Sequence, residues 1–236
     1  MTKLQTIPWL RIGAESIAIV GSILLAFAID ASWDSRVERA EQQAYLANLQ
    51  VQFEQTLGRL QNHLVALENA LEATTRILSL NAEDAKAIGW EDFAELLHRS
   101  VLPGRQNFPS GALEALIASG DLRIITDREL AAKLTDWSSL IAEAYENATW
   151  VVENRDNRVR PLLWEHGING LQFDKRLAGL PPSHFEPSLE TLYADPRLDG
   201  VLYVRVSYIG ISLDRHRTLA AEAEAILGLI ERSIDN

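Results

Sequence analysis

The sequence predicts an all-α protein, in which an N-terminal transmembrane helix continues into a long helix and joins an antiparallel helical bundle. Three observations support this fold class. The run from Ser16 to Ile29 carries no charged residue, which is typical of a helix in lipid. From Phe53 onward, leucines recur at alternating steps of four and three, the spacing of a helix that packs on another helix. Alternating patterns typical of strands are nearly absent.

The predicted membrane helix covers residues 9–33 and follows an N-terminal tail, residues 1–8. From Ile12 to Ile29 its only charged residue is Glu15, and as a helix this stretch measures roughly 27 Å, close to a thin hydrocarbon core. Tryptophans stand at both ends of the predicted helix, where indole rings favour the headgroup region. A single-pass helix in a bacterial cytoplasmic membrane is therefore predicted.

A cleaved signal peptide is the alternative, because Ala26-Phe27-Ala28 resembles an A-x-A cleavage site. Against it, no helix breaker separates Ile29 from the amphipathic pattern that follows. Basic residues are nearly balanced on the two sides of the span, and the N-terminal amine tips the balance slightly toward an inside N-terminus. The side of the soluble domain stays open, with a lean to the extracytoplasmic side.

Small residues recur along the predicted span, and such spacing lets two membrane helices approach closely. They are Ala14, Ala18, Gly21, Ser22 and Ala26. This pattern predicts a homo-oligomer, although small residues are also simply common in membrane helices. Glu15 is either a functional carboxylate within the membrane or a headgroup-level partner of Arg11.

The soluble domain, residues 34–236, is predicted to begin with a long helix, residues 34–80, that leaves the membrane without a break. Its apolar seam is predicted to meet a partner helix as in a coiled coil. The seam consists of Phe53, Leu57, Leu60, Leu64, Leu67, Leu71 and Leu78.

Shorter helices are predicted within residues 91–166, a loop at 167–187 that is rich in glycine and proline, and a long C-terminal helix at 195–235. Ser110 is expected to cap one helix that stops at Gly120, and Thr126 with Glu129 is read as the capping box of the next. Together these helices predict an antiparallel bundle on a stalk.

Composition excludes several kinds of site. The net charge of −11 argues against nucleic acid as a partner, and the absence of cysteine removes thiolate chemistry and cysteine metal sites. Known catalytic and phosphate-binding motifs are missing, and the five histidines show no ligand-like spacing. The sequence therefore predicts no enzyme activity, no cofactor and no metal site. His216 alone falls on a predicted buried stripe, where it is either hydrogen-bonded or able to titrate near neutral pH.

Two blocks of the sequence resemble a family of uncharacterised bacterial single-pass membrane proteins. The first runs from Leu10-Arg11-Ile12-Gly13-Ala14-Glu15 through the apolar span to Trp33, and continues to Tyr45-Leu46-x-x-Leu49. The second runs from Ala112 to Leu134 and centres on the turn Ser119-Gly120-Asp121-Leu122. The resemblance implies a membrane anchor and a helical domain, and it implies no activity. The turn is read as a tight helix-to-helix connection that can also bind a partner.

The preferred functional hypothesis is a membrane-anchored, non-enzymatic scaffold or adaptor, whose partners are the lipid bilayer, further copies of the chain and a membrane protein. A bundle that senses a small ligand is the first alternative. An ion path through Glu15 in an oligomer is the second.

Overall fold

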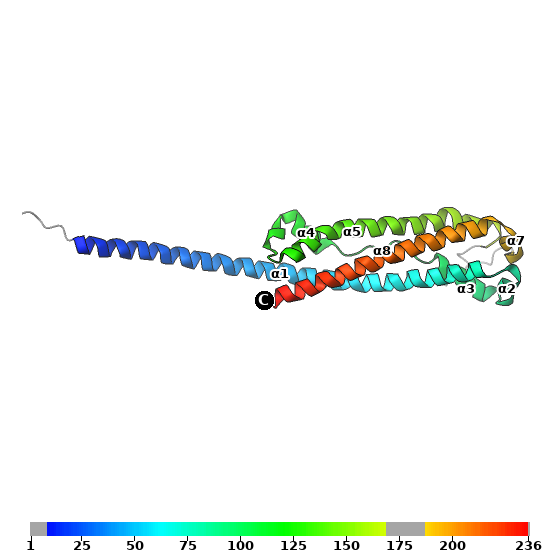
Figure 1. Ribbon diagram of the computed structural model, residues 1–236, viewed down its shortest axis with the longest axis horizontal. Helices are drawn as coiled ribbons and strands as arrows, with labels where there is room; N and C mark the ends of the chain where they lie inside the picture. Colours follow the sequence, from blue (N-terminus) through cyan, green and yellow to red (C-terminus); the bar gives the residue numbers. More distant parts are fainter. Residues whose placement is uncertain (1–8, 169–186, 236) are drawn as a thin grey trace, which may run out of the picture.

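The computed structural model describes residues 9–168 and 187–235, with side chains from Val20 onward, and this part of the chain is all-α. Helix α1 (Trp9–Ser79) has 71 residues, which corresponds to roughly 105 Å. It is one continuous helix across the boundary between the predicted membrane segment and the predicted stalk. Its N-terminal part projects away from the rest of the molecule (Figure 1), and its C-terminal part belongs to the bundle.

The bundle is built on α1, α5 (Arg128–Asn154) and α8 (Arg197–Ile234), with α8 packed against both other helices. Helix α8 runs back toward the projecting part of α1, so α1 and α8 are antiparallel (Figure 1). Shorter helices complete the bundle: α2 (Ala82–Ala87), α3 (Trp90–Val101), α4 (Gly111–Ser119), the 3₁₀ turn η1 (Asp121–Ile124), α6 (Arg160–Glu165) and α7 (Leu189–Ala194).

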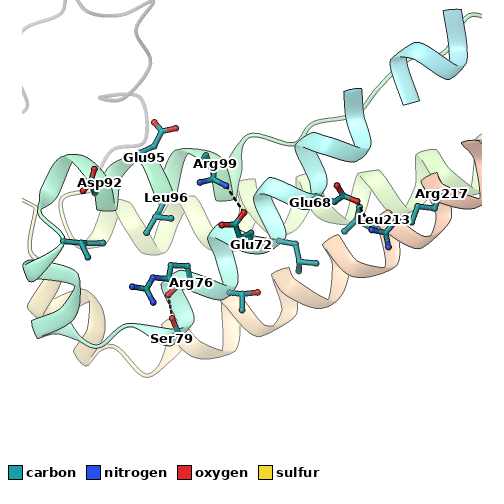
Figure 2. A pocket seen from close by; sticks show the side chains of 13 residues that line it. Glu68, Glu72, Arg76, Ser79, Asp92, Glu95, Leu96, Arg99, Leu213 and Arg217 are labelled. Carbon is teal, nitrogen blue, oxygen red and sulfur yellow. Dashed lines mark hydrogen bonds and ion pairs between the residues drawn. The ribbon is translucent and has the colours of Figure 1, made fainter. Parts of the chain in front are cut away.

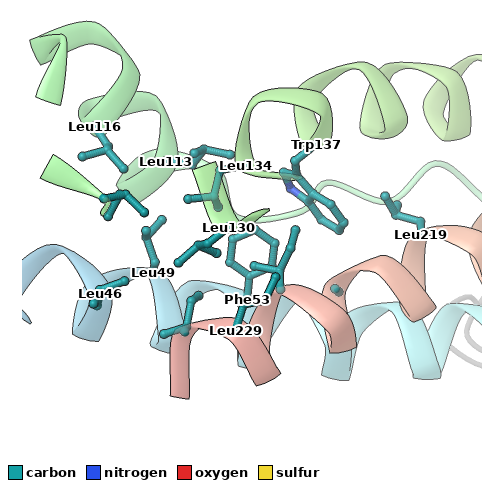
Figure 3. Close-up of a cluster of buried hydrophobic side chains, with 14 of the residues drawn as sticks. Leu46, Leu49, Phe53, Leu113, Leu116, Leu130, Leu134, Trp137, Leu219 and Leu229 are labelled. Atoms are coloured by element: carbon teal, nitrogen blue, oxygen red, sulfur yellow. The ribbon is translucent and has the colours of Figure 1, made fainter. Parts of the chain in front are cut away.

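The largest apolar cluster lies where α1 enters the bundle, between α1, α4, α5 and α8 (Figure 3). At its centre the rings of Phe53 and Trp137 lie 4.9 Å apart at 58°, and both side chains are buried. The two sequence blocks described above meet in this cluster, because Leu46 and Leu49 pack with Leu113. Buried leucines thus account for the spacing within both blocks.

The turn at Ser119–Leu122 joins α4 to η1. Gly120 has a φ of 76°, a left-handed conformation that suits a residue without a Cβ, and it ends α4. Asp121 then accepts a hydrogen bond of 3.0 Å from the Tyr45 hydroxyl of α1. Hydrogen bonding with Ser119, and next with Tyr45, lowers the pKa of Asp121, and the contact with Asp121 raises the pKa of Tyr45. The turn therefore fastens α4 to the base of the stalk.

Two predicted helix caps are wrong. The Ser110 side chain makes no capping hydrogen bond to α4; instead Oε1 of Gln52 on α1 accepts from the backbone N–H groups of Ala112, at 2.7 Å, and Leu113. Helix α5 is capped by Asp127 rather than Thr126, since the Asp127 carboxylate accepts from the first turn. A cap supplied by a distant helix has no local sequence signature.

Removal of the Gln52 cap is expected to destabilise the bundle. The Gln52→Ala variant should lose about 1 kcal/mol of the free energy of unfolding, the usual cost of a lost helix cap. Urea unfolding followed by circular dichroism measures this loss. Gln52→Glu is the matched control, because it keeps an acceptor oxygen at a helix N-terminus and should retain most of the stability. Equal stability of Gln52→Ala and the wild type would contradict the assigned role.

Helix α5 continues into α6 through η2 (Arg155–Val159), a π-helical turn. Pro161 lies just after this turn and has no backbone N–H to donate to the carbonyl four residues earlier. The wider π turn accommodates this missing bond without ending the helix. The predicted loop at 167–187 lies almost entirely outside the described residues, as does the predicted tail at 1–8.

Candidate functional site

The projecting part of α1 presents apolar side chains with nothing packed on them within the described chain. Six large apolar residues between positions 20 and 29 are 50–66% exposed: Val20, Ile23, Leu24, Leu25, Phe27 and Ile29. Trp33 beyond them is 67% exposed. These positions fall on all sides of the helix, so no single packed neighbour can cover them together.

Of the small residues predicted to pack between membrane helices, Gly21, Ser22 and Ala26 lie on this exposed segment. A Cβ added at Gly21 would meet no atom within 4 Å. Ala14, Glu15 and Ala18 have side chains outside the described residues. Within the part of the chain searched, no helix combines the length and apolarity needed to cross a bilayer.

Only some residues of the predicted seam of α1 face the core. Phe53, Leu60 and Leu67 are fully buried, whereas Leu57, Leu64, Leu71 and Leu78 are half-buried at its edge. The second column of core positions is instead Leu49, Thr56, His63, Ala70 and Ile77, each seven residues from the next. The predicted seam contained leucines and omitted Thr56 and His63 because these two residues are polar. Both are nevertheless buried in the interior.

Arg205 of α8 is the most unusual interior residue, since its side chain is fully buried. Its guanidinium donates to the Ser100 carbonyl, through Nε at 2.8 Å and through a second nitrogen, and to the Val151 carbonyl at 3.2 Å. The Ser100 carbonyl belongs to the last turn of α3, where carbonyls have no partner within the helix. Arg205 therefore joins α3, α5 and α8 through backbone oxygens.

Other cations and one carboxylate lie close to Arg205. Arg155 and Arg160 both pair with Asp156, at 2.8 and 2.7 Å, and Arg155 also donates to the Pro103 carbonyl. Burial, followed by repulsion from Arg155 and Arg160, lowers the pKa of Arg205 to about 9, so it stays charged at neutral pH. Arg205 therefore has a structural role, because its guanidinium N–H groups donate to backbone carbonyls of two other helices.

His63 of α1 and His216 of α8 meet in the core, although 152 residues separate them in the sequence. Their ring centroids are 4.6 Å apart in an edge-to-face arrangement, and Phe108 packs 6.3 Å from His216. Nδ1 of His216 lies 2.7 Å from the Ser212 carbonyl. Nε2 of His63 is buried and has no hydrogen-bond partner among the described residues.

Both histidines are held neutral by their surroundings. Burial, with a smaller contribution from His216, lowers the pKa of His63 to about 4. Burial also lowers the pKa of His216, against an opposing effect of the Ser212 carbonyl. The sequence identified His216 as a candidate but not its pairing with His63. Among the described residues, no group of three or more potential ligands is placed to hold a metal ion.

A surface cavity of about 860 Å³ opens between α1, α3 and α8 (Figure 2). Leu71, Leu96 and Leu213 are among its apolar lining residues. Ion pairs stand along its sides, where Arg99 contacts Glu72 at 3.2 Å and Arg217 contacts Glu68 at 2.8 Å. A second cavity of about 530 Å³ lies between α5 and α8 beside Trp150 and Tyr208. Neither cavity contains a recognisable catalytic group.

The resemblance to the single-pass membrane family stays a prediction, and it rests on the two sequence blocks described above. No protein-family model matches this chain, and no curated protein or solved structure matches it significantly.

Proposed function

We propose that this chain is a single-pass, membrane-anchored helical-bundle protein of a bacterial cytoplasmic membrane, acting as a non-enzymatic oligomeric scaffold or adaptor. The observation that carries the proposal is the exposed apolar part of α1. A fully exposed side chain of this kind gains about 1.5–3 kcal/mol by leaving water, so the six from Val20 to Ile29, which are 50–66% exposed, would gain roughly 5–12 kcal/mol together. Lipid covers a helix that is apolar on every side.

The sequence extends this argument toward the N-terminus. The run from Ile12 to Ile29 contains one charged residue, Glu15, and α1 continues through it as one helix. The stalk then carries the bundle away from the bilayer surface. A slight excess of N-terminal positive charge favours a bundle on the extracytoplasmic side.

The scaffold role follows from what the bundle offers to a partner. Arg205 and His216 of its interior bond to backbone carbonyls, which suits a rigid body more than a reactive centre. The cavity beside Leu96 favours the ligand-sensing bundle as second candidate. Leu96→Trp should narrow that cavity and obstruct a ligand bound beside Leu96. A ligand-sensing protein would then lose the thermal stabilisation that a bound metabolite gives the wild type. An adaptor would show no such stabilisation in either form.

Membrane fractionation tests the anchor. The wild type should sediment with membranes and require detergent for release. Leu24→Arg with Phe27→Arg should move most of the protein into the supernatant, because an arginine costs about 2.5–3.5 kcal/mol at the centre of a span and less toward its ends, and two apolar side chains are lost as well.

The matched control places arginine at two exposed apolar positions of the bundle, Val65→Arg with Tyr203→Arg. These side chains are 56% and 66% exposed, so the same chemical change there should leave the protein in the membrane fraction. A wild-type chain that stays in the supernatant without detergent would refute the proposed anchor.

A further inference from the structure

A second apolar stripe lies along α1 on the face opposite the bundle core. It follows the coiled-coil spacing of four and three and is called the outer stripe here: Trp33, Val37, Ala40, Ala44, Ala47 and Val51. All six residues are exposed, with Val37 at 44% and Val51 at 53%. The intervening Leu46 and Leu49 point into the bundle instead and are fully buried.

Half of the outer stripe, Trp33, Val37 and Ala40, precedes the first bundle contact at Gln42, on the part of α1 that projects from the bundle (Figure 1). Contacts with the bundle begin near Gln42, which donates to Thr126 at 3.1 Å, and Tyr45, which donates to Asp121. A lone helix in water gains little stability from its own hydrogen bonds, so most helices depend on packing along an apolar face. The stalk between Asp34 and Glu41 therefore has an unused packing face.

We infer that the outer stripe packs against the outer stripe of a second copy of this chain, forming a short parallel coiled coil above the membrane. The inference rests on the proposed function, because a shared bilayer holds both α1 helices in the same direction and at high local concentration. Alanine at three positions lets the two helices approach closely. The two bundles then lie on the outer sides of the helix pair.

The charged residues that flank the outer stripe are complementary in a parallel pair of α1 helices. The spacing places Val37, Ala44 and Val51 at heptad position a, with Arg36 at g and Glu41 at e. In a parallel coiled coil, position g of one helix faces position e of the next heptad in the other.

Arg36 of each copy therefore faces Glu41 of the other copy, and two-fold symmetry makes this ion pair twice. Both side chains are exposed. The following g–e pair, Gln43 with Asn48, is uncharged and introduces no repulsion. Beyond Val51 the next position of the stripe is Glu54, so the apolar contact ends there.

Disulfide trapping tests the inference directly, because the chain has no cysteine. Ala40→Cys and Ala44→Cys in the full-length protein, reconstituted in lipid vesicles and mildly oxidised, should form disulfide-linked dimers. Glu38→Cys is the matched control, since Glu38 is equally exposed but lies outside the stripe. It should give at least about fivefold less dimer, because a disulfide requires Cβ atoms about 4 Å apart.

Charge exchange gives a second readout. Arg36→Glu or Glu41→Arg in the Ala44→Cys background should lower dimer formation about fivefold, since each places like charges in contact twice. The double exchange should restore it. Equal crosslinking of Ala44→Cys and Glu38→Cys, or no crosslinking of either in protein that remains in the vesicles, overturns the coiled coil and leaves the anchor standing. Protein that fails to enter the vesicles refutes the anchor itself.

Discussion

Replacing Arg205 with methionine should lower the free energy of unfolding by about 3 kcal/mol, although methionine is apolar and the site is in the core. A buried ion is often replaced by apolar residues without loss when its partners are replaced as well. Here the partners are the carbonyls of Ser100 and Val151, which remain when Arg205 is removed. The Val151 carbonyl still accepts from the Arg155 backbone N–H, whereas the Ser100 carbonyl loses both bonds from Arg205. An unpaired buried carbonyl costs about 1–3 kcal/mol, and bonds from a charged donor are lost as well.

Chemical unfolding of the full-length protein in detergent, followed by tryptophan fluorescence, measures this effect. Arg205→Lys separates charge from geometry, because lysine keeps the charge but cannot reach both carbonyls with a planar fork. We expect a loss of stability between those of the wild type and methionine. If Arg205→Met unfolds at the same denaturant concentration as the wild type, Arg205 does not hold α3, α5 and α8 together.

Mild acid should destabilise the bundle through His63. Its pKa in the folded protein is about 4, against an ordinary value near 6.5 in the unfolded chain, so the unfolded chain binds more protons between these values. The stabilisation is complete above pH 6.5 and is lost as the pH falls toward 4. At pH 4.5 the loss amounts to about 2–3 kcal/mol relative to pH 7.5. His216 acts in the same direction.

Between pH 6.5 and 4.5 the change in stability reports on protonation of the histidines and not on that of the paired aspartates. The paired aspartates Asp121, Asp156 and Asp195 have lowered pKa values in the folded protein, and they lose their stabilising effect only as the unfolded chain is protonated near pH 3.8. His63→Gln should therefore flatten the stability profile over this range. The effect of the substitution on the free energy of unfolding, apart from any titration, is measured at pH 7.5. An unchanged fall in stability on acidification would rule out His63 as its source.

The all-α class and the long helices were predictable because heptad spacing and helix stops are local properties of the chain. Gly120 and the run of leucines after Phe53 are examples. Which residues of α1 face the core was harder to predict. Thr56 and His63 are polar, and the nearby leucines are better candidates for the core by hydrophobicity alone. The burial of His63 depends on α8, which supplies His216 to the same part of the interior.

The polar contacts of the interior could not be predicted for the same reason. Gln52 caps a helix that starts some sixty residues later, and Arg205 binds carbonyls that lie more than fifty residues away. Such pairings depend on how the helices are arranged in three dimensions. The predicted membrane helix, by contrast, follows from composition alone, and its exposed second half is the part of the structure on which the proposed function depends.

Labelling of single cysteines with a membrane-impermeant maleimide tests that central proposal most directly. In vesicles containing the full-length protein, Leu24→Cys and Phe27→Cys should stay unlabelled until detergent is added, while Glu38→Cys in bundle-outward molecules should react at once. Rapid labelling of all three positions in intact vesicles would contradict a helix buried in lipid.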